Sequence, residues 1–243
     1  MKPFLLLASR AEDAAAEDEY GAYLRYGGLA PEQLRRIRLE AAPLPELNLA
    51  EYSGVIVGGS PFTSSDPPDH KSATQHRVER ELAGLLDRIV DQDFPFLGAC
   101  YGVGTLGTHQ GAVIDRTFGE SLGGVEIELT DAGIADPVLR GMPRRFTAFT
   151  GHKEACTSLP SHAVLLASSQ ACPVQMFRIK QNLYATQFHP ELDVEGLVTR
   201  IDIYRHAGYF PPESAEELMA AARRFTVTEP MAILKNFVAR YAS

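Results

Sequence analysis

The sequence predicts an α/β fold of three layers, in which a mostly parallel β-sheet is flanked by helices. Apolar or β-branched runs alternate with helical patterns through the first half of the chain, an order typical of parallel strands joined by crossover helices. Further strand-like runs follow at shorter intervals, which favours a smaller antiparallel set. The chain then ends in a helical tail.

Four runs in the first half predict strands. They are Phe4–Ala8, Ile37–Ala41, Gly54–Gly58 and Phe94–Ala99. The acidic run Ala11–Tyr20 has no acid inside an apolar stripe, and we expect a solvated helical face there. A second helix is predicted over Ser72–Gln92, where Ser72 and Gln75 form a capping box. Its apolar face consists of Val78, Leu82, Leu85, Leu86 and Ile89.

The second half predicts five more strands and three helices. The strands are expected at Val125–Leu129, Arg145–Phe149, Val164–Ala167, Val174–Ile179 and Leu183–Gln187. The helices are expected at Val194–Ala207, Glu213–Arg224 and Met231–Tyr241, separated by prolines. This tail could cover a functional site or form a homodimer contact, and both alternatives stay open.

The composition is that of a folded protein without a nucleic-acid partner. Hydrophobic residues make up 45% of the chain and charged residues 22%, as in ordinary globular proteins. The net charge is −8 and no basic cluster occurs, whereas nucleic-acid binding needs grouped Lys and Arg. No long flexible linker interrupts the 243 residues. We therefore expect a single domain over residues 1–243, with a helical C-terminal extension at about 194–243.

The amino terminus and the cysteines indicate the compartment. The segment MKPFLLLASRAED has too short an apolar run for a signal peptide or a membrane span. Cys100, Cys156 and Cys172 are odd in number and form no CxxC pair, so we expect the reducing cytoplasm, with the latter two as inert core thiols. No cysteine pair lies near His70 and His76, and we expect neither a metal ion nor a cofactor.

Cys100 lies where a nucleophile would be presented. The run FPFLGACYGVG is a buried strand followed at once by G-x-C-x-G, and small residues allow the sharp turn of a nucleophile elbow. A helix beginning at Tyr101 would favour a thiolate and then an oxyanion through its dipole and free N–H groups. The alternative is that Cys100 is a small core residue.

A base for this nucleophile is predicted at the end of a later strand. In QFHPE, His189 and Glu191 are two residues apart, so in extended backbone both side chains share a face and the carboxylate can reach the imidazole. Cys100, His189 and Glu191 therefore form a candidate catalytic triad. The alternative is a surface histidine in a turn with a solvated glutamate.

These motifs resemble the class I glutamine amidotransferases, whose flavodoxin-like glutaminase domains join a G-x-C-x-G elbow to a later H-P-E. GVIVGGSP, Gly54–Pro61, is similar to the glycine turn that supplies one oxyanion N–H in that family. GHKEAC, Gly151–Cys156, looks like the H-x-D/E segment of domains related to the glutaminase part of GMP synthase. The resemblance runs from Gly54 to Glu191.

The resemblance implies hydrolysis of the glutamine side-chain amide through a cysteinyl thioester, releasing glutamate and ammonia for an unidentified acceptor or synthetase partner. It implies an oxyanion hole formed by the backbone N–H groups of Gly59 and Tyr101. Candidate substrate-binding residues are Gly58, Gly104, His152 and Glu154.

One departure from the family pattern leaves the substrate open. Gly104 stands where many members carry a glutamine that holds the substrate, and its small size would open space near the elbow. The triad could therefore act on another γ-glutamyl amide. A third alternative is a non-catalytic regulatory module, for which slow labelling of Cys100 by iodoacetamide would be evidence.

Overall fold

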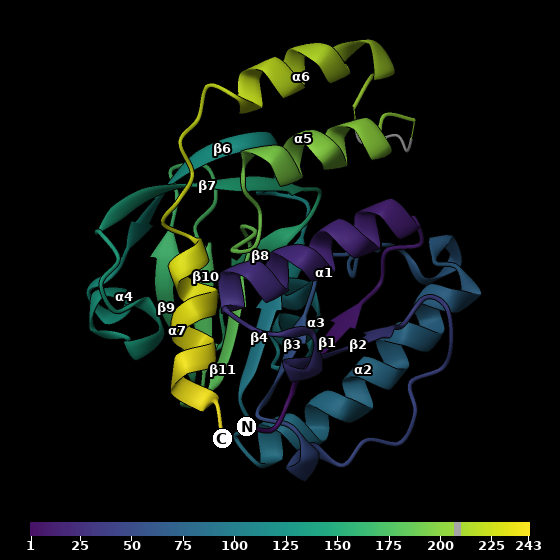
Figure 1. The fold of residues 1–243 in the computed structure, drawn as a ribbon, viewed down its shortest axis with the longest axis vertical. Coiled ribbons are helices and arrows are strands. Elements are labelled where there is room, and N and C mark those ends of the chain that lie inside the picture. Colours follow the sequence, from purple (N-terminus) through teal and green to yellow (C-terminus); the bar gives the residue numbers. More distant parts are fainter. Residues whose placement is uncertain (207–209) are drawn as a thin grey trace.

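The centre of the fold is a nine-stranded mixed sheet (Figure 1), seen in a computed structural model that describes residues 1–206 and 210–243. Its strand order is β2-β1-β3-β4-β11-β10-β9-β6-β7. The first five strands in this order are parallel and the rest join by antiparallel pairing. They are β2 (Leu34–Arg38), β1 (Phe4–Ala8), β3 (Gly54–Val57), β4 (Phe96–Ala99), β11 (Leu183–Thr186), β10 (Met176–Ile179), β9 (Ala163–Ser168), β6 (Glu120–Leu129) and β7 (Arg145–His152).

Helices cover both faces of the sheet, which confirms the predicted three-layer α/β architecture. The seven α-helices of the described residues are α1 (Asp13–Gly27), α2 (Ala73–Asp91), α3 (Tyr101–His109), α4 (Asp131–Ala135), α5 (Val194–Ile203), α6 (Ala215–Ala222) and α7 (Met231–Tyr241). Alternation along β1 divides the core, because Leu5 and Leu7 pack with α2 and α3 whereas Phe4 and Leu6 pack with α1 and α7.

The helix predicted after Ser72 is confirmed as α2, and its five apolar residues are buried. Ser72 Oγ accepts a hydrogen bond from the backbone N–H of Gln75 at 3.1 Å. The prediction that the Gln75 side chain completes a capping box with Ser72 is wrong, because this side chain donates to the carbonyl oxygen of Thr63 at 2.9 Å. This second bond ties α2 to the loop after β3.

Strand β2 begins three residues before its predicted range. It is an edge strand that carries three arginines, so a search for an apolar run misses it. A separate pair, β5 (Val113–Asp115) and β8 (Ala155–Ser158), was not predicted, since each strand is too short to show a period. Helix α5 ends at Ile203, and the predicted end at Ala207 lies outside the described residues.

The expectation that the acids of Ala11–Tyr20 all face solvent is wrong for Glu19. That side chain is fully buried in α1, next to Ala15 and Ala16, which are also buried. The sequence pattern could not show this, because the group that neutralises Glu19 comes from elsewhere in the fold.

The helical tail is part of the packed fold. α7 lies beside α1 over the sheet, where Ile233 and Phe237 are fully buried. α5 and α6 stack on each other beyond the end of the sheet (Figure 1) and enclose a smaller core around Phe149. The three cysteines are free thiols. In the described part of the chain, no helix has both the length and the apolar character that a bilayer span needs.

Candidate active site

The predicted elbow is present between β4 and α3. Cys100 has φ 52° and ψ −83°, a backbone conformation that costs a non-glycine residue energy and is typical of functional turns. Its N–H donates to the carbonyl oxygen of Thr186 at 2.7 Å, at the end of neighbouring β11. The turn therefore holds Cys100 at the carboxyl edge of the parallel strands.

The glycine before Cys100 allows β4 and α3 to approach closely. A Cβ on Gly98 would lie 2.6 Å from the Cα of Gly102, whereas a Cβ on Gly102 would have no neighbour within 4 Å. The first glycine of the G-x-C-x-G motif is therefore required by backbone packing, and the second is not.

We predict that Gly98→Ala lowers the free energy of unfolding by about 1–3 kcal/mol, because the added carbon must push the strand and helix apart. Gly102→Ala is the matched control, and it should be neutral or stabilising by up to about 1 kcal/mol, since alanine is the better helix former. Denaturant unfolding measures both values. Equal destabilisation by the two substitutions would contradict this account of the elbow.

His189 and Glu191 form the predicted pair. Nδ1 of His189 lies 2.9 Å from Oε1 of Glu191, and the two side chains are 9% and 0% exposed. Because an ionised carboxylate only accepts, this contact assigns the proton of the neutral ring to Nδ1 and leaves the lone pair on Nε2. Such a ring can take a proton from a nucleophile.

Cys100 and His189 line the same pocket. This pocket, the larger of two that Cys100 lines, has a volume of about 830 Å³ and extends toward α5. Leu197 and Arg200 of α5 line its wall, and so does Tyr204, which follows the helix directly. A smaller pocket of about 370 Å³ also meets Cys100 and is lined by Gln187, whose side-chain amide nitrogen lies 3.9 Å from Sγ. Cys100 therefore lines both pockets.

Burial and charged neighbours compete in setting the pKa values of the three groups. It raises the pKa of the Cys100 thiol to about 12, and the opposing attraction of Arg10 is smaller. Burial also lowers the pKa of His189. Burial acts against ionisation of Glu191, but His189 and Arg200 outweigh it and hold the pKa of that carboxyl below its usual range.

The helix terminus is expected to favour a thiolate at Cys100, and burial acts in the opposite direction. Burial therefore favours a neutral Cys100 thiol and a neutral His189 ring. A neutral thiol that attacks must give up its proton, and His189, which lines the same pocket, is the candidate acceptor.

The two predicted oxyanion donors flank the site. A Cβ on Gly59 would lie 2.6 Å from Cε1 of His189 and 2.8 Å from Nη2 of Arg10, so the glycine turn packs directly on the imidazole. Tyr101 begins α3, where the first N–H groups have no partner within the helix, and it lines the smaller pocket.

The candidate substrate-binding residues lie in different places. His152 lines both pockets and Glu154 lines the smaller one. Gly58 faces the Glu19 carboxylate, with Oε2 2.8 Å from the position of a Cβ. The space expected at Gly104 is filled by Ser64 Oγ and by Oε1 of Glu154, so that expectation is wrong.

Glu154 connects the loop after β3 to the site. Its Oε1 accepts from the N–H of Ser64 at 2.8 Å and its Oε2 from the N–H of Ser65 at 2.6 Å. Ser60 and Phe62 of the same loop line the smaller pocket. A carboxylate that receives two backbone donors is well satisfied, and we assign Glu154 to holding this loop.

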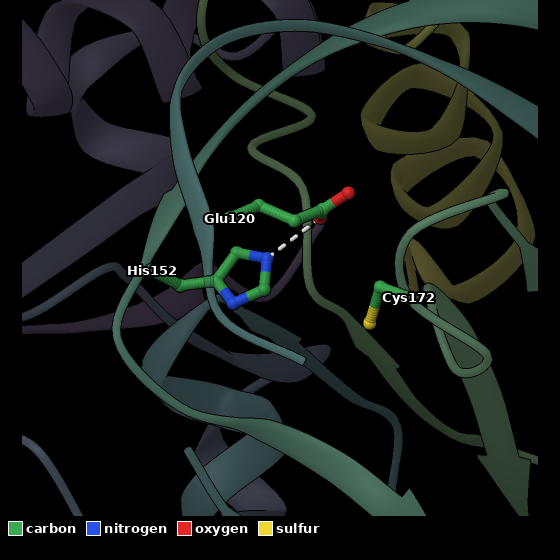
Figure 2. Close-up of side chains that lie close together, drawn as sticks. All are labelled: Glu120, His152 and Cys172. Carbon is green, nitrogen blue, oxygen red and sulfur yellow. Dashed lines mark hydrogen bonds and ion pairs between the residues drawn. The ribbon is translucent and has the colours of Figure 1, made fainter. Parts of the chain in front are cut away.

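Glu120, His152 and Cys172 bring ligand-type atoms within 4.8 Å of one another (Figure 2). Nε2 of His152 lies 2.8 Å from Oε2 of Glu120, and Nδ1 lies 2.8 Å from the carbonyl oxygen of Glu154. Gln175 also donates to Oε2 of Glu120, at 2.7 Å. These hydrogen bonds use both ring nitrogens and the facing carboxylate oxygen, so we assign the cluster to holding β6 against β7.

Three charged residues of the site were missed by the sequence analysis. Arg10 and Arg200 line the larger pocket, and Glu19 lies between them. The position of Arg10 directly after a strand was a usable signal, since side chains at strand ends converge on one edge of the sheet. Arg200 carried no such signal, because an arginine on an amphipathic helix is normally solvated.

An elbow cysteine and a histidine–carboxylate pair on a sheet of this kind define a hydrolase or acyl-transfer class of protein. The family model described as "Glutamine amidotransferase class-I" matches residues 31–196. The chain belongs to the class I glutamine amidotransferase family, as the motifs had indicated.

Relatives and solved structures agree with this assignment. A glutamine-hydrolysing GMP synthase subunit from Thermococcus kodakarensis is 28% identical over 184 residues, which cover 75% of this chain and 86% of that protein. The corresponding protein from Thermoplasma volcanium is 33% identical over 46% of this chain and 55% of that protein. A glutamine amidotransferase structure from Thermotoga maritima superposes with a TM-score of 0.79 at 20% identity, covering 100% of this chain and 99% of that one, and it supports the fold.

Proposed function

We propose that the protein is a glutaminase that hydrolyses the side-chain amide of glutamine through a thioester on Cys100. The observation that carries the proposal is the shared pocket, which is lined by Cys100 and by His189, whose Nδ1 is already engaged by Glu191. The family match supports a glutamine-directed reaction.

The proposed reaction first acylates Cys100 and then hydrolyses the thioester. Sγ of Cys100 bonds to the amide carbon while its proton passes to Nε2 of His189, and the carbonyl oxygen becomes an oxyanion near the N–H groups of Gly59 and Tyr101. His189 then gives this proton to the amide nitrogen, the carbon–nitrogen bond breaks and ammonia leaves. Water attacks the thioester, His189 accepts one of its protons and returns it to Sγ, and glutamate is released.

The ammonia would pass to a synthetase partner. The relatives named as glutamine-hydrolysing GMP synthase subunits support a chain that works beside a second protein. The chain covers 55% and 65% of the length of two of these relatives. We leave the chemistry of the acceptor to the partner.

The test measures ammonia and glutamate released from glutamine by the purified protein, with the Cys100→Ala variant in parallel. We expect wild type to release ammonia and glutamate in equal amounts and the variant to release neither. The assignment is wrong if the variant releases as much ammonia as wild type. Labelling by iodoacetamide does not separate a catalytic protein from a regulatory one here, because the raised pKa of Cys100 slows alkylation in either case.

The size of the larger pocket favours a second candidate, a hydrolase of γ-glutamyl amides with a substituted nitrogen. His189 would protonate the leaving nitrogen, so the leaving group lies on the side that His189 lines. The pocket extends from there toward Leu197 and Arg200 of α5, which leaves room for a substituent on that nitrogen. Comparing kcat/KM for glutamine and for N-alkyl γ-glutamyl amides separates the two, since a glutaminase prefers the unsubstituted amide.

A further inference from the structure

We propose that Arg200 of α5 is a positioning residue for the His189–Glu191 pair, and that with Arg10 and Glu19 it completes a buried charge network around the base. This inference rests on the proposed function, because it assigns a role within the same site. It also gives the C-terminal helices a part in the chemistry.

The contacts of Arg200 reach both members of the pair. Its Nη2 donates to Oε1 of Glu191 at 2.8 Å, and its Nη1 lies 3.2 Å from Nδ1 of His189. The Arg200 side chain is 7% exposed and that of Glu191 0%. Two groups, the imidazole and the guanidinium, therefore contact the same carboxylate oxygen, and all three side chains are buried.

A second carboxylate balances the network. Oε1 of Glu19 accepts from Nε of Arg10 at 2.9 Å and lies 3.7 Å from Nη2 of Arg200. Arg10 in turn donates to the hydroxyl of Tyr204 at 3.2 Å. Two guanidinium groups thus face two carboxylates, and burial is tolerated because every charge has an opposite neighbour.

The network restricts the proton on His189. Glu191 requires the hydrogen on Nδ1, and the guanidinium of Arg200 beside that atom disfavours a second proton on Nε2. The other titratable or charged groups that interact with this pair or line its pocket are Arg10, Asp18, Glu19, Tyr23, Cys100, Glu120, His152, Lys153 and Tyr204. Among the groups acting on His189, Arg200 and Arg10 favour the neutral ring and Glu191 favours the charged ring.

The glycine turn is packed into the same network. Glu19 contacts Gly58 and Arg10 contacts Gly59, each at the position where a side chain would begin. Three charged residues therefore converge on the triad and on the proposed oxyanion turn. They are Glu19 on α1, Arg10 after β1 and Arg200 on α5. Arg200 links the tail to this assembly, which explains why a charged residue is buried on α5.

The test is the titration of the His189 ring by NMR in wild type and in Arg200→Met, with the resonance assigned from its loss in His189→Gln. The wild-type pKa should lie below the ordinary histidine value of about 6.5. Arg200→Met should raise it by about one pH unit or more, since removing a like charge at this range favours the imidazolium. Protonation of the base then begins at higher pH, and the acid limb of kcat/KM for glutamine should move in the same direction.

The matched control is Arg205→Met, which removes an arginine that pairs with Asp202 and Glu216 just after the same helix and should leave the His189 titration unchanged. If Arg200→Met fails to fold, Arg200→Gln removes the same positive charge, keeps a hydrogen-bond donor for Glu191 and should also raise the pKa of His189. A folded variant with the wild-type pKa at His189 overturns the proposal.

The titration needs no substrate, so it tests the role of Arg200 even if the protein does not hydrolyse glutamine. Where glutamine is hydrolysed, Arg200→Lys keeps the charge but loses the two-pronged contact. It should lower kcat by about 10- to 100-fold with little change in KM, as expected for a residue that orients a catalytic group. A wild-type kcat in this variant would also overturn the proposal.

Discussion

Replacing Cys100 with alanine is expected to abolish the release of ammonia from glutamine, with a loss in kcat on the order of 10⁴-fold or more. Without Sγ no thioester can form, and water would have to attack the amide directly. Cys100→Ser should also lose most activity, because His189 is arranged to take the proton of a thiol and a hydroxyl is far less acidic. Ammonia release under saturating glutamine measures both effects.

The control for this experiment is Cys156→Ala, which removes a buried thiol from the core beside α3 and leaves the site unchanged. Its kcat should stay within about threefold of wild type, although its stability can fall by about 1 kcal/mol through the lost packing. If Cys100→Ala retains the wild-type rate, the thioester mechanism is wrong for this protein. Loss of activity in Cys156→Ala with unchanged stability would point to a second essential thiol.

Gly59→Ala is expected to lower kcat/KM by about 100-fold while the protein stays folded. The new methyl group would begin 2.6 Å from Cε1 of His189 and 2.8 Å from Nη2 of Arg10, so both groups must move. A displacement of about 1 Å in a catalytic group typically costs this much. Loss of the Gly59 N–H from its proposed oxyanion position would reduce the rate in the same direction.

Gly84→Ala on α2 provides the matched control, because a Cβ there meets nothing within 4 Å. It should leave kcat/KM unchanged and raise the free energy of unfolding by up to about 1 kcal/mol, through better helix propensity. Thermal unfolding of both variants separates a local effect on the site from a loss of fold. A Gly59→Ala enzyme with the wild-type kcat/KM would show that the glycine turn does not constrain His189.

The elbow and the histidine–glutamate pair could be found without coordinates because their geometry is local. Five consecutive residues, Gly98–Gly102, define the elbow, and His189 and Glu191 are only two residues apart. The extended backbone expected between them is wrong, because residues 189–192 form a turn in which the N–H of Leu192 donates to the carbonyl oxygen of His189 at 3.3 Å, and the two side chains meet within this turn. The long amphipathic helix α2 was predicted within one residue at each end because its pattern is also local. Edge strand β2 and the short pair β5–β8 lacked such local patterns.

Gly104 illustrates the limit of a local argument. The small size of Gly104 predicted open space beside it. The side chains of Ser64 and Glu154, which come from segments distant in the chain, occupy that space instead. Whether a missing side chain leaves a cavity depends on which atoms the rest of the fold brings there. Close packing makes it common for such space to be filled.

The order of elements, the candidate nucleophile and its candidate base follow from the amino-acid sequence, since periodicity, turn chemistry and short spacing act between neighbours in the chain. The protonation of the thiol and the network of Arg10, Glu19 and Arg200 depend on the folded molecule. The sequence does not distinguish a buried charged side chain from a solvated one. The free energy of burying the charge depends on partners that can lie almost two hundred residues away in the chain.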